Sequence, residues 1–138
     1  MSEEADYSDI KSDELYRNKL STLEYYVTRE SGTERAYTGK YNLENRDGKY
    51  YCICCNHILF NSDMKYESMC GWPSFHTEHK NANIDRIIDN SHGMKRIEVR
   101  CNKCNAHLGH VFDDGPKKHG GERYCINSAS LKFVKGNK

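Results

Sequence analysis

The chain has 138 residues and a net charge of +1, so its length suits one domain and its balanced charge provides no basic field for nucleic acid. Its mean hydropathy of −0.94 predicts a thin core that a metal ion or cross-links would support, and no apolar run is long enough to span a membrane. The N-terminus is acidic where a secretory or transit peptide would be basic, so we expect a cytoplasmic protein. In that reducing compartment, seven cysteines are expected to serve metal binding or catalysis.

The first part of the chain predicts a tail followed by helices. Residues 1–11 are polar and acidic, which predicts a flexible tail, and residues 12–138 are expected to form a single domain. The apolar spacing over residues 13–20 predicts a short amphipathic helix. A second helix is predicted from Ser21, because Ser21 and Glu24 have the spacing of a capping box.

The rest of the chain has β-type patterns. Residues 84–88 and 95–100 flank a polar, glycine-containing loop and predict a hairpin, whose second arm alternates apolar and charged side chains as in a sheet with one face in water. We therefore expect a mainly β fold: a small antiparallel domain of two packed sheets with one or two short N-terminal helices. The remaining predicted strands are separated by polar or glycine-rich turns and cover residues 49–53, 106–112, 123–127 and 131–134.

Four cysteines form two CxxC pairs, Cys52 with Cys55 and Cys101 with Cys104, each just after a predicted strand. Two such pairs supply the four thiolate ligands of a structural zinc site. The interval between the pairs exceeds the usual zinc-ribbon spacing of about 15–20 residues, so the ion is expected to hold two distant hairpins together. The alternatives are two redox pairs or four unconnected buried thiols. Cys54 is left as a spare thiol.

Cys125 lies in a predicted strand, two residues after Arg123. A guanidinium keeps its charge at any working pH, so Arg123 would favour the thiolate of Cys125, the form of cysteine that attacks electrophilic sulfur or carbon. Cysteine is also among the most buried residue types. The alternative is therefore a half-buried strand residue beside a surface arginine.

Cys70 lies in a loop that Pro73 makes rigid and that contains Trp72, the one tryptophan of the chain. An accessible loop thiol has the properties of a resolving cysteine, which must reach an oxidised partner and attack it. Trp72 could equally be a core residue that anchors the loop.

Two histidines, His107 and His110, lie three residues apart on a predicted strand with Gly109 between them. In a regular strand this spacing would place them on opposite faces, so both can line one pocket if the glycine introduces a bulge or bend. Histidine is the side chain best suited to deliver a proton near neutral pH. The alternatives are additional metal ligands or surface residues whose hydrogen bonds are satisfied.

Five segments, between about Ser21 and Phe133, resemble the signature segments of the B-type methionine sulfoxide reductases in order and spacing. The chain departs from that family pattern at Met69, where glycine is usual, at Ala36, where proline is common, and at Gly121-Glu122. The segments that carry the resemblance are Thr28-Arg29-Glu30, Gly32-Thr33-Glu34-Arg35, Cys70-Gly71-Trp72-Pro73-Ser74-Phe75, His107-Leu108-Gly109-His110-Val111-Phe112-Asp113-Asp114-Gly115-Pro116 and Arg123-Tyr124-Cys125-Ile126-Asn127-Ser128-Ala129-Ser130.

The resemblance implies a catalytic domain with one structural zinc ion that reduces the R epimer of methionine sulfoxide, free or within proteins. It implies that Cys125 is the nucleophile, which becomes a sulfenic acid, and that Cys70 resolves it to a Cys70–Cys125 disulfide reduced by thioredoxin. Trp72 would face the substrate methyl group, and Arg123 would favour the thiolate. The residues around the sulfoxide would be His107, His110 and Asn127. We expect a monomer without nucleic-acid or membrane partners.

Two other functions would use some of the same residues. A non-catalytic zinc-ribbon module would explain the four paired cysteines but would give no role to Cys70, Trp72 or Cys125, and the chain lacks a basic face with interleaved aromatic residues. A thiol peroxidase would use Cys70 and Cys125 against a peroxide. Comparing hydrogen peroxide with a sulfoxide substrate would separate these activities.

Overall fold

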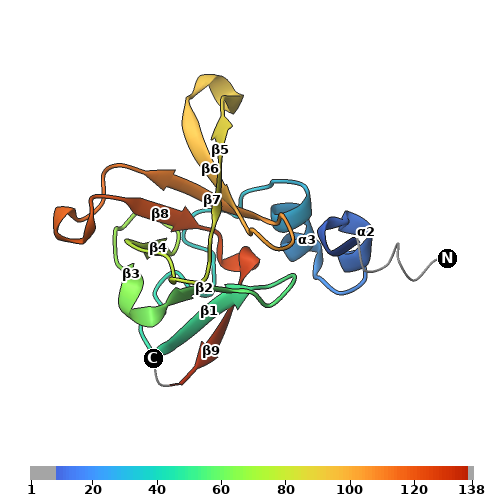
Figure 1. The fold of residues 1–138 in the computed structure, drawn as a ribbon, viewed down its shortest axis with the longest axis horizontal. Helices are drawn as coiled ribbons and strands as arrows, with labels where there is room; N and C mark the ends of the chain where they lie inside the picture. Colours follow the sequence, from blue (N-terminus) through green and yellow to red (C-terminus); the bar gives the residue numbers. More distant parts are fainter. Residues whose placement is uncertain (1–8, 137–138) are drawn as a thin grey trace.

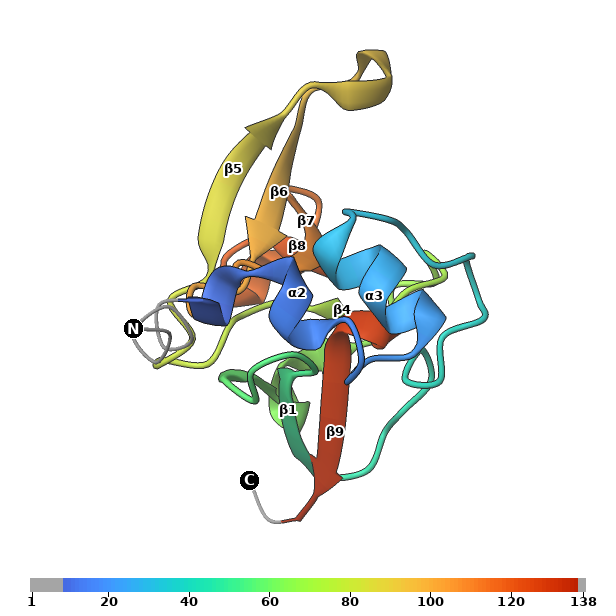
Figure 2. The same ribbon diagram turned by 90° about the vertical axis from the view of Figure 1, so that its right-hand side faces the viewer.

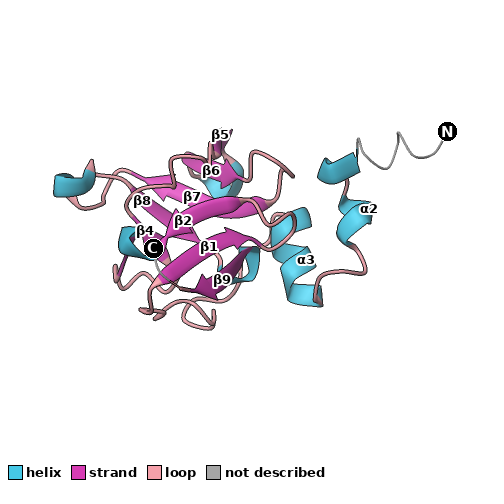
Figure 3. Cartoon of the chain, turned by 60° about the horizontal axis from the view of Figure 1, so that its bottom comes forward, coloured by secondary structure: helices cyan, strands magenta, loops and turns pink. Residues whose placement is uncertain are grey.

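The computed structural model describes residues 9–136, so residues 1–8, most of the expected tail, lie outside the described part. The described chain begins with the 3₁₀-helix η1 (Asp9–Lys11), whose Ile10 packs against the hydrophobic core. The helices α2 (Asp13–Tyr16) and α3 (Thr22–Arg29) follow and lie together on one side of the strands (Figure 3). No helix between residues 9 and 136 has the length and apolar character that a membrane crossing needs.

The predicted helix starts are present, but the first helix is short. At α3, the Ser21 hydroxyl accepts from the Glu24 amide at 3.1 Å and the Glu24 carboxylate accepts from the Ser21 amide at 2.9 Å, so the capping box is confirmed. α2 ends at Tyr16 although helix was predicted to residue 20. Tyr16 is fully buried, and its hydroxyl donates to the Ile10 carbonyl at 2.6 Å, which ties η1 to the core.

Nine strands form two antiparallel sheets in the described residues, which confirms the predicted fold class (Figure 1). The smaller sheet has the order β2-β1-β9, and the larger has the order β3-β4-β8-β7-β6-β5. Besides these strands, short 3₁₀-helices η2 (Ser62–Met64), η3 (Ser91–Gly93), η4 (Lys117–His119) and η5 (Ser128–Ser130) occur in the turns. The strands are β1 (Gly48–Cys52), β2 (Ile58–Asn61), β3 (Lys65–Tyr66), β4 (Ser74–Phe75), β5 (Asp85–Asp89), β6 (Arg96–Arg100), β7 (His107–Phe112), β8 (Arg123–Ile126) and β9 (Leu131–Lys135).

An aromatic cluster joins the two sheets. Phe60 on β2 stacks on Phe75 of β4, with ring centroids 4.0 Å apart and planes 10° from parallel. Tyr50 on β1 meets the same Phe75 ring edge-on at 5.1 Å, and Tyr124 on β8 contacts Phe60 at 5.7 Å. Because each sheet contributes to the cluster, these contacts hold the two layers face to face.

The β5–β6 hairpin projects from the body of the domain (Figures 1 and 2). Its register pairs Ile87 with Glu98 and Asp89 with Arg96, so the predicted hairpin is confirmed. The prediction that its second arm has one face in water is wrong at Glu98. This residue is 7 % exposed, because its carboxylate accepts hydrogen bonds from other side chains instead of from water.

A bulge in β7 lies between the two histidines. The pairing of β6 with β7 shifts so that Val99 faces Gly109 while the next residue, Arg100, faces His107. This is the irregularity that the His107–His110 spacing requires if both histidines are to serve one site. Gly109 is necessary here, because a Cβ atom at this position would lie 2.0 Å from the Cys125 carbonyl oxygen on β8.

Candidate functional site

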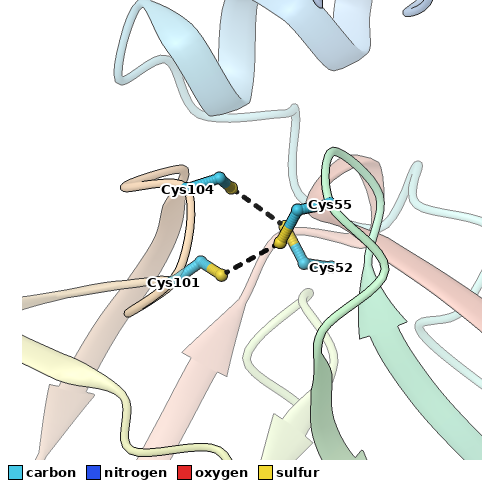
Figure 4. Close-up of side chains that lie close together, drawn as sticks. All are labelled: Cys52, Cys55, Cys101 and Cys104. Carbon is cyan, nitrogen blue, oxygen red and sulfur yellow. Dashed lines mark hydrogen bonds between the residues drawn. The ribbon is translucent and has the colours of Figure 1, made fainter. Parts of the chain in front are cut away.

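The four paired cysteines meet at one point between the turns that follow β1 and β6 (Figure 4). All their Sγ atoms lie within 4.8 Å of one another, with 3.5 Å from Cys52 to Cys104 and 3.6 Å from Cys55 to Cys101. A tetrahedral ion with metal–sulfur bonds of about 2.3 Å would place its ligands about 3.8 Å apart. The four thiols therefore fit a single metal ion, and Cys54 is not part of the cluster.

The two cysteine turns are built alike. The Cys52 carbonyl accepts from the Asn56 amide at 2.8 Å, and the Cys101 carbonyl accepts from the Asn105 amide at 2.9 Å. Both asparagines have left-handed backbones, with φ of 67° and 68°, a conformation that asparagine tolerates better than most residues. Each turn therefore presents its two thiols in the same way.

The remaining site thiols, Cys125 and Cys70, lie side by side. Cys125 on β8 is paired with Ser74 on β4, and Cys70 lies in the loop that leads into β4. The two Sγ atoms are 3.8 Å apart, although the residues are 55 positions apart in the chain. A disulfide has a sulfur–sulfur distance of about 2.0 Å, so a local movement of the loop would join them.

The two thiols share a hydrogen bond that sets their ionisation. The bond from Cys125 lowers the pKa of Cys70 to about 4. The same contact, together with burial, raises the pKa of Cys125, although the positive charge of Arg123 acts in the opposite direction. The hydrogen bond between the two sulfurs therefore favours the thiol form of Cys125 and the thiolate form of Cys70.

Arg123 is fixed beside the thiols by an ion pair. Its Nε and one terminal nitrogen contact the Asp114 carboxylate at 2.8 and 3.2 Å, and its guanidinium lies over the Phe112 ring at 4.5 Å. This ion pair raises the pKa of Arg123, so the guanidinium stays charged. Arg123 therefore has the effect on Cys125 that we expected, but burial and the contact with Cys70 outweigh it.

Cys125 opens into a cavity of about 100 Å³. Three predicted site residues, Trp72, His110 and Asn127, line the cavity with it, whereas Cys70 and His107 do not. The half-buried position of Trp72 shows that it is not a core residue. Gly109 also lines the cavity, as do three residues to which the sequence analysis assigned no role: Thr33, Arg96 and Phe112.

Each histidine is held by a carboxylate. Nδ1 of His107 contacts Glu98 Oε2 at 2.7 Å, and Nε2 of His110 contacts Asp89 Oδ2 at 2.8 Å. A carboxylate can only accept, so these ring nitrogens carry the protons and the neutral tautomer of each ring is defined. His107 is buried behind His110, with the ring centroids 5.7 Å apart.

Burial and hydrogen bonding have opposing effects on the pKa values of His110 and Glu98. Burial lowers the pKa of His110, although Asp89 opposes this effect, so His110 favours the neutral form. Burial would raise the pKa of Glu98, but the hydrogen bonds from His107 and Arg100 outweigh it and hold the pKa at about 2. Glu98 is therefore a buried carboxylate that remains ionised.

Glu34 connects two walls of the cavity. Its backbone amide donates to Asn127 Oδ1 at 3.0 Å, and its carbonyl accepts from Trp72 Nε1 at 3.0 Å. Its buried carboxylate accepts from the Ser128 and Ala129 amides, each at 2.9 Å. The Asn127 amide is also fixed by donating to the Leu108 carbonyl at 3.0 Å.

Sequence reasoning did not assign roles to Glu34, Asp89 or Glu98. Glu34 belongs to a segment that resembles the reductase family, so that segment was a signal for it. Asp89 and Glu98 lie on the β5–β6 hairpin, where Asp89 had been assigned to the loop between the arms and Glu98 to the face in water. Their pairing with the histidines follows from the alignment of β5, β6 and β7 in the larger sheet.

Relatives with known names match almost the whole chain. The protein is 53% identical over 128 residues to a Caenorhabditis elegans protein named "Probable methionine-R-sulfoxide reductase B", covering 92% of this chain and 84% of the relative. It is 52% identical over 136 residues to the "Peptide methionine sulfoxide reductase MsrB" of Burkholderia multivorans, covering 96% and 95%. The protein of the same name from Chromohalobacter salexigens is 49% identical over 126 residues, covering 91% and 95%.

A solved structure and a family model complete the comparison. The structure described as "Crystal Structure of Mis18 'Yippee-like' Domain" matches with a TM-score of 0.52 at 16% identity, covering 67% of this chain and 100% of that one, which shows a shared fold alone. The family model described as "SelR domain" matches residues 20–135. The chain therefore belongs to the SelR family of B-type methionine sulfoxide reductases.

Proposed function

We propose that this enzyme reduces methionine-R-sulfoxide, the reaction named for its relative from Caenorhabditis elegans, with Cys125 as nucleophile and Cys70 as resolving cysteine. The observation that carries the assignment is the position of Cys125. Its side chain lines the cavity with Trp72, His110 and Asn127, and its sulfur is 3.8 Å from that of Cys70.

In the first step, the Cys125 thiolate attacks the sulfoxide sulfur while a proton reaches the sulfoxide oxygen. The attack forms a bond between the Cys125 sulfur and the substrate sulfur. The protonated oxygen then transfers from the substrate sulfur to the Cys125 sulfur while the bond between the two sulfurs breaks, so methionine leaves and Cys125 becomes a sulfenic acid. The Cys125 thiol must lose its proton before the attack, and the charge of Arg123 favours this loss. We assign the contact with the substrate methyl group to Trp72, which lines the cavity, because a flat aromatic wall can distinguish a methyl group from oxygen.

We propose His110 as the proton donor, because it lines the cavity and His107 does not. Its Nε2–H is already directed to Asp89, so the proton for the sulfoxide must come from Nδ1 of the charged ring. The negative charge of Asp89 stabilises that charged ring while burial opposes it. We assign to Asn127 and His107 the role of orienting the sulfoxide and His110.

In the second step, Cys70 attacks the Cys125 sulfenic acid, water leaves, and a disulfide joins the two residues. Its reduction to two thiols needs an external thiol reductant, for which we propose thioredoxin. The substrates are free or protein-bound methionine-R-sulfoxide. We propose that the enzyme acts as a monomer in the cytoplasm, where a reducing environment maintains its thiols.

We propose zinc as the ion at the four-cysteine cluster. Four thiolates in tetrahedral geometry are typical of zinc or of iron–sulfur chemistry, and two CxxC turns are the common arrangement of a structural zinc site. When bound there, zinc would supply stability by joining the β1–β2 and β6–β7 turns. The cluster uses no residue of the Cys125 cavity.

The experiment that tests this function measures turnover of the separated R and S epimers of a blocked methionine sulfoxide, first with dithiothreitol and then with thioredoxin. Wild type should reduce the R epimer, Cys125→Ser should be inactive, and Cys70→Ser should keep dithiothreitol turnover but lose thioredoxin turnover. A wild-type protein with full metal content that reduces neither epimer would refute the proposal. Faster turnover of hydrogen peroxide than of the R epimer would instead favour the peroxidase.

A further inference from the structure

The two site sulfurs face different spaces. Cys125 lines the cavity described above, which Cys70 does not reach. Cys70 lines a second groove of about 440 Å³, which Cys125 does not reach, together with Ser68, Pro116 and Arg123. A disulfide between them would therefore have one sulfur at each opening.

The choice of sulfur matters for the reduction of that disulfide. An attacking thiolate approaches along the sulfur–sulfur axis and expels the far sulfur as the leaving thiolate. Attack on Cys70 releases the Cys125 thiolate, which is the nucleophile for the next substrate. Attack on Cys125 would instead place the reductant in the space that the methionine side chain occupies.

Two exposed apolar side chains lie against the Cys70 loop. Tyr37 is 65% exposed and Met69 is 77% exposed. The Tyr37 amide donates to the Gly71 carbonyl at 2.7 Å, and the Tyr37 hydroxyl donates to the Met69 carbonyl at 2.8 Å. Single exposed apolar residues are ordinary, but Tyr37 is hydrogen-bonded to the carbonyls of Met69 and Gly71, the two residues that flank Cys70.

The backbone adds rigidity to this pair, which we name the Tyr37–Met69 platform. Tyr37 and Met69 have φ of 67° and 68°, a left-handed conformation that is uncommon for side chains of this size. A backbone held by these hydrogen bonds has less freedom to lose when a partner binds, and tyrosine and methionine are both enriched in protein interfaces. The platform is therefore suited to docking a protein.

We propose that a protein dithiol reductant docks on the Tyr37–Met69 platform and attacks Cys70 through the second groove, while the substrate uses the separate opening at Cys125. This inference rests on the proposed reductase function. The reductant thiolate bonds to the Cys70 sulfur, and the Cys70–Cys125 bond breaks with the electron pair leaving on Cys125. The second thiolate of the reductant then displaces Cys70, so the reductant ends as a disulfide and the enzyme as a dithiol.

The charged residues around the groove indicate which charges the surface of the docking partner carries. Arg123 is neutralised by Asp114 within the groove, whereas Lys117 and Lys118 are exposed on η4, directly after the groove residue Pro116. A partner with an apolar surface around its attacking cysteine and acidic residues at the rim would match this arrangement.

A trapping experiment identifies the attacked sulfur. The oxidised enzyme is mixed with a thioredoxin whose second active-site cysteine is replaced by serine, so that the mixed disulfide persists, and the cross-linked peptides are identified by mass spectrometry. The proposal expects thioredoxin bonded to Cys70. A cross-link to Cys125 would overturn it.

A second experiment tests the platform. Tyr37→Asn combined with Met69→Gly removes both side chains and places residues that accept positive φ, so the backbone is not strained. The ratio of thioredoxin-driven to dithiothreitol-driven kcat/KM should fall about tenfold, as expected when interface anchors are lost. Leu43→Ser is the matched control, because Leu43 is 74% exposed and should leave the ratio unchanged.

The outcomes separate this inference from the proposed function. If dithiothreitol supports reduction of the R epimer but the double variant keeps the wild-type ratio, the platform is refuted and the function stands. If wild type reduces no sulfoxide with dithiothreitol, the function itself fails. Unfolding temperatures of the variants establish that a change in ratio does not arise from loss of structure.

Discussion

Asp89, at the end of β5, accepts a hydrogen bond from Nε2 of His110 on β7 at a distance of 2.8 Å. The two residues do not belong to adjacent strands, because β6 lies between β5 and β7 in the sheet. Arg96 on β6 also contacts the Asp89 carboxylate, at 3.5 Å. The projecting hairpin is therefore connected to the Cys125 cavity by a charged group that fixes the histidine.

Asp89→Asn should lower the rate and shift its pH dependence. Asp89 raises the pKa of His110 against the effect of burial, so its loss should lower that pKa further and reduce the fraction of charged ring near neutral pH. We expect kcat with the R epimer to fall about tenfold or more, in the range for loss of general acid catalysis. A pH–rate profile measures this, and its descending limb should move to lower pH. An unchanged profile would remove His110 from the proposed proton transfer.

Cys70→Ser should make Cys125 more acidic. The contact with Cys70 is the largest cause of the raised Cys125 pKa, so removing that thiol should lower the pKa and leave the opposing charge of Arg123. The rate of alkylation of Cys125 by iodoacetamide, measured against pH, reports this pKa. The reactivity curve should move to lower pH in the variant. A curve that moves to higher pH would contradict this effect of Cys70.

Glu98→Gln should destabilise the protein at neutral pH more than at low pH. The Glu98 pKa is about 2 in the folded protein against 4.5 ordinarily, so its contribution is fully present above about pH 4.5 and is lost as the pH falls through about 2. We expect the variant to be less stable by about 3 kcal/mol at pH 7, with the difference shrinking on acidification. Urea unfolding at several pH values measures it.

Glu14→Gln is the surface control for this comparison. Its carboxylate pairs with Arg17, and the two side chains are 80% and 56% exposed. Exposed ion pairs contribute about 1 kcal/mol or less, so this substitution should change stability little at any pH. A similar loss of unfolding free energy in both variants would show that burial of Glu98 does not increase its contribution to stability.

Cys104→Ser should remove the metal ion, whereas Cys54→Ser should retain it. Cys104 belongs to the four-thiol cluster, and Cys54, adjacent to its member Cys55, does not. A structural zinc site contributes about 10–16 kcal/mol of apparent binding free energy, so the Cys104 variant should not fold stably. Elemental analysis should find one zinc per chain in wild type and in Cys54→Ser. Equal zinc in the Cys104 variant would exclude the cluster as the site.

The features that the sequence predicted correctly are local ones. The Ser21 capping box and the β5–β6 hairpin depend on residues within a few positions of each other. The CxxC pairs are similarly local, because two residues between thiols suffice to place both on one ion. Strands β2, β3 and β4 were missed. β3 and β4 have two residues each and depend on pairing with their neighbours, and β2 has four residues with two adjacent buried positions, so none of them has an alternating pattern to detect.

By itself, the sequence determined which residues are candidates for the site: Cys125, Cys70 and the two histidines stand out by residue type and by resemblance. Tertiary structure decided which groups lie together. The alignment of β5, β6 and β7 brings Asp89 and Glu98 to the histidines, and the pairing of β4 with β8 brings Cys70 to Cys125 across 55 residues. Strand alignment depends on packing across the whole sheet, so no local pattern specifies these contacts.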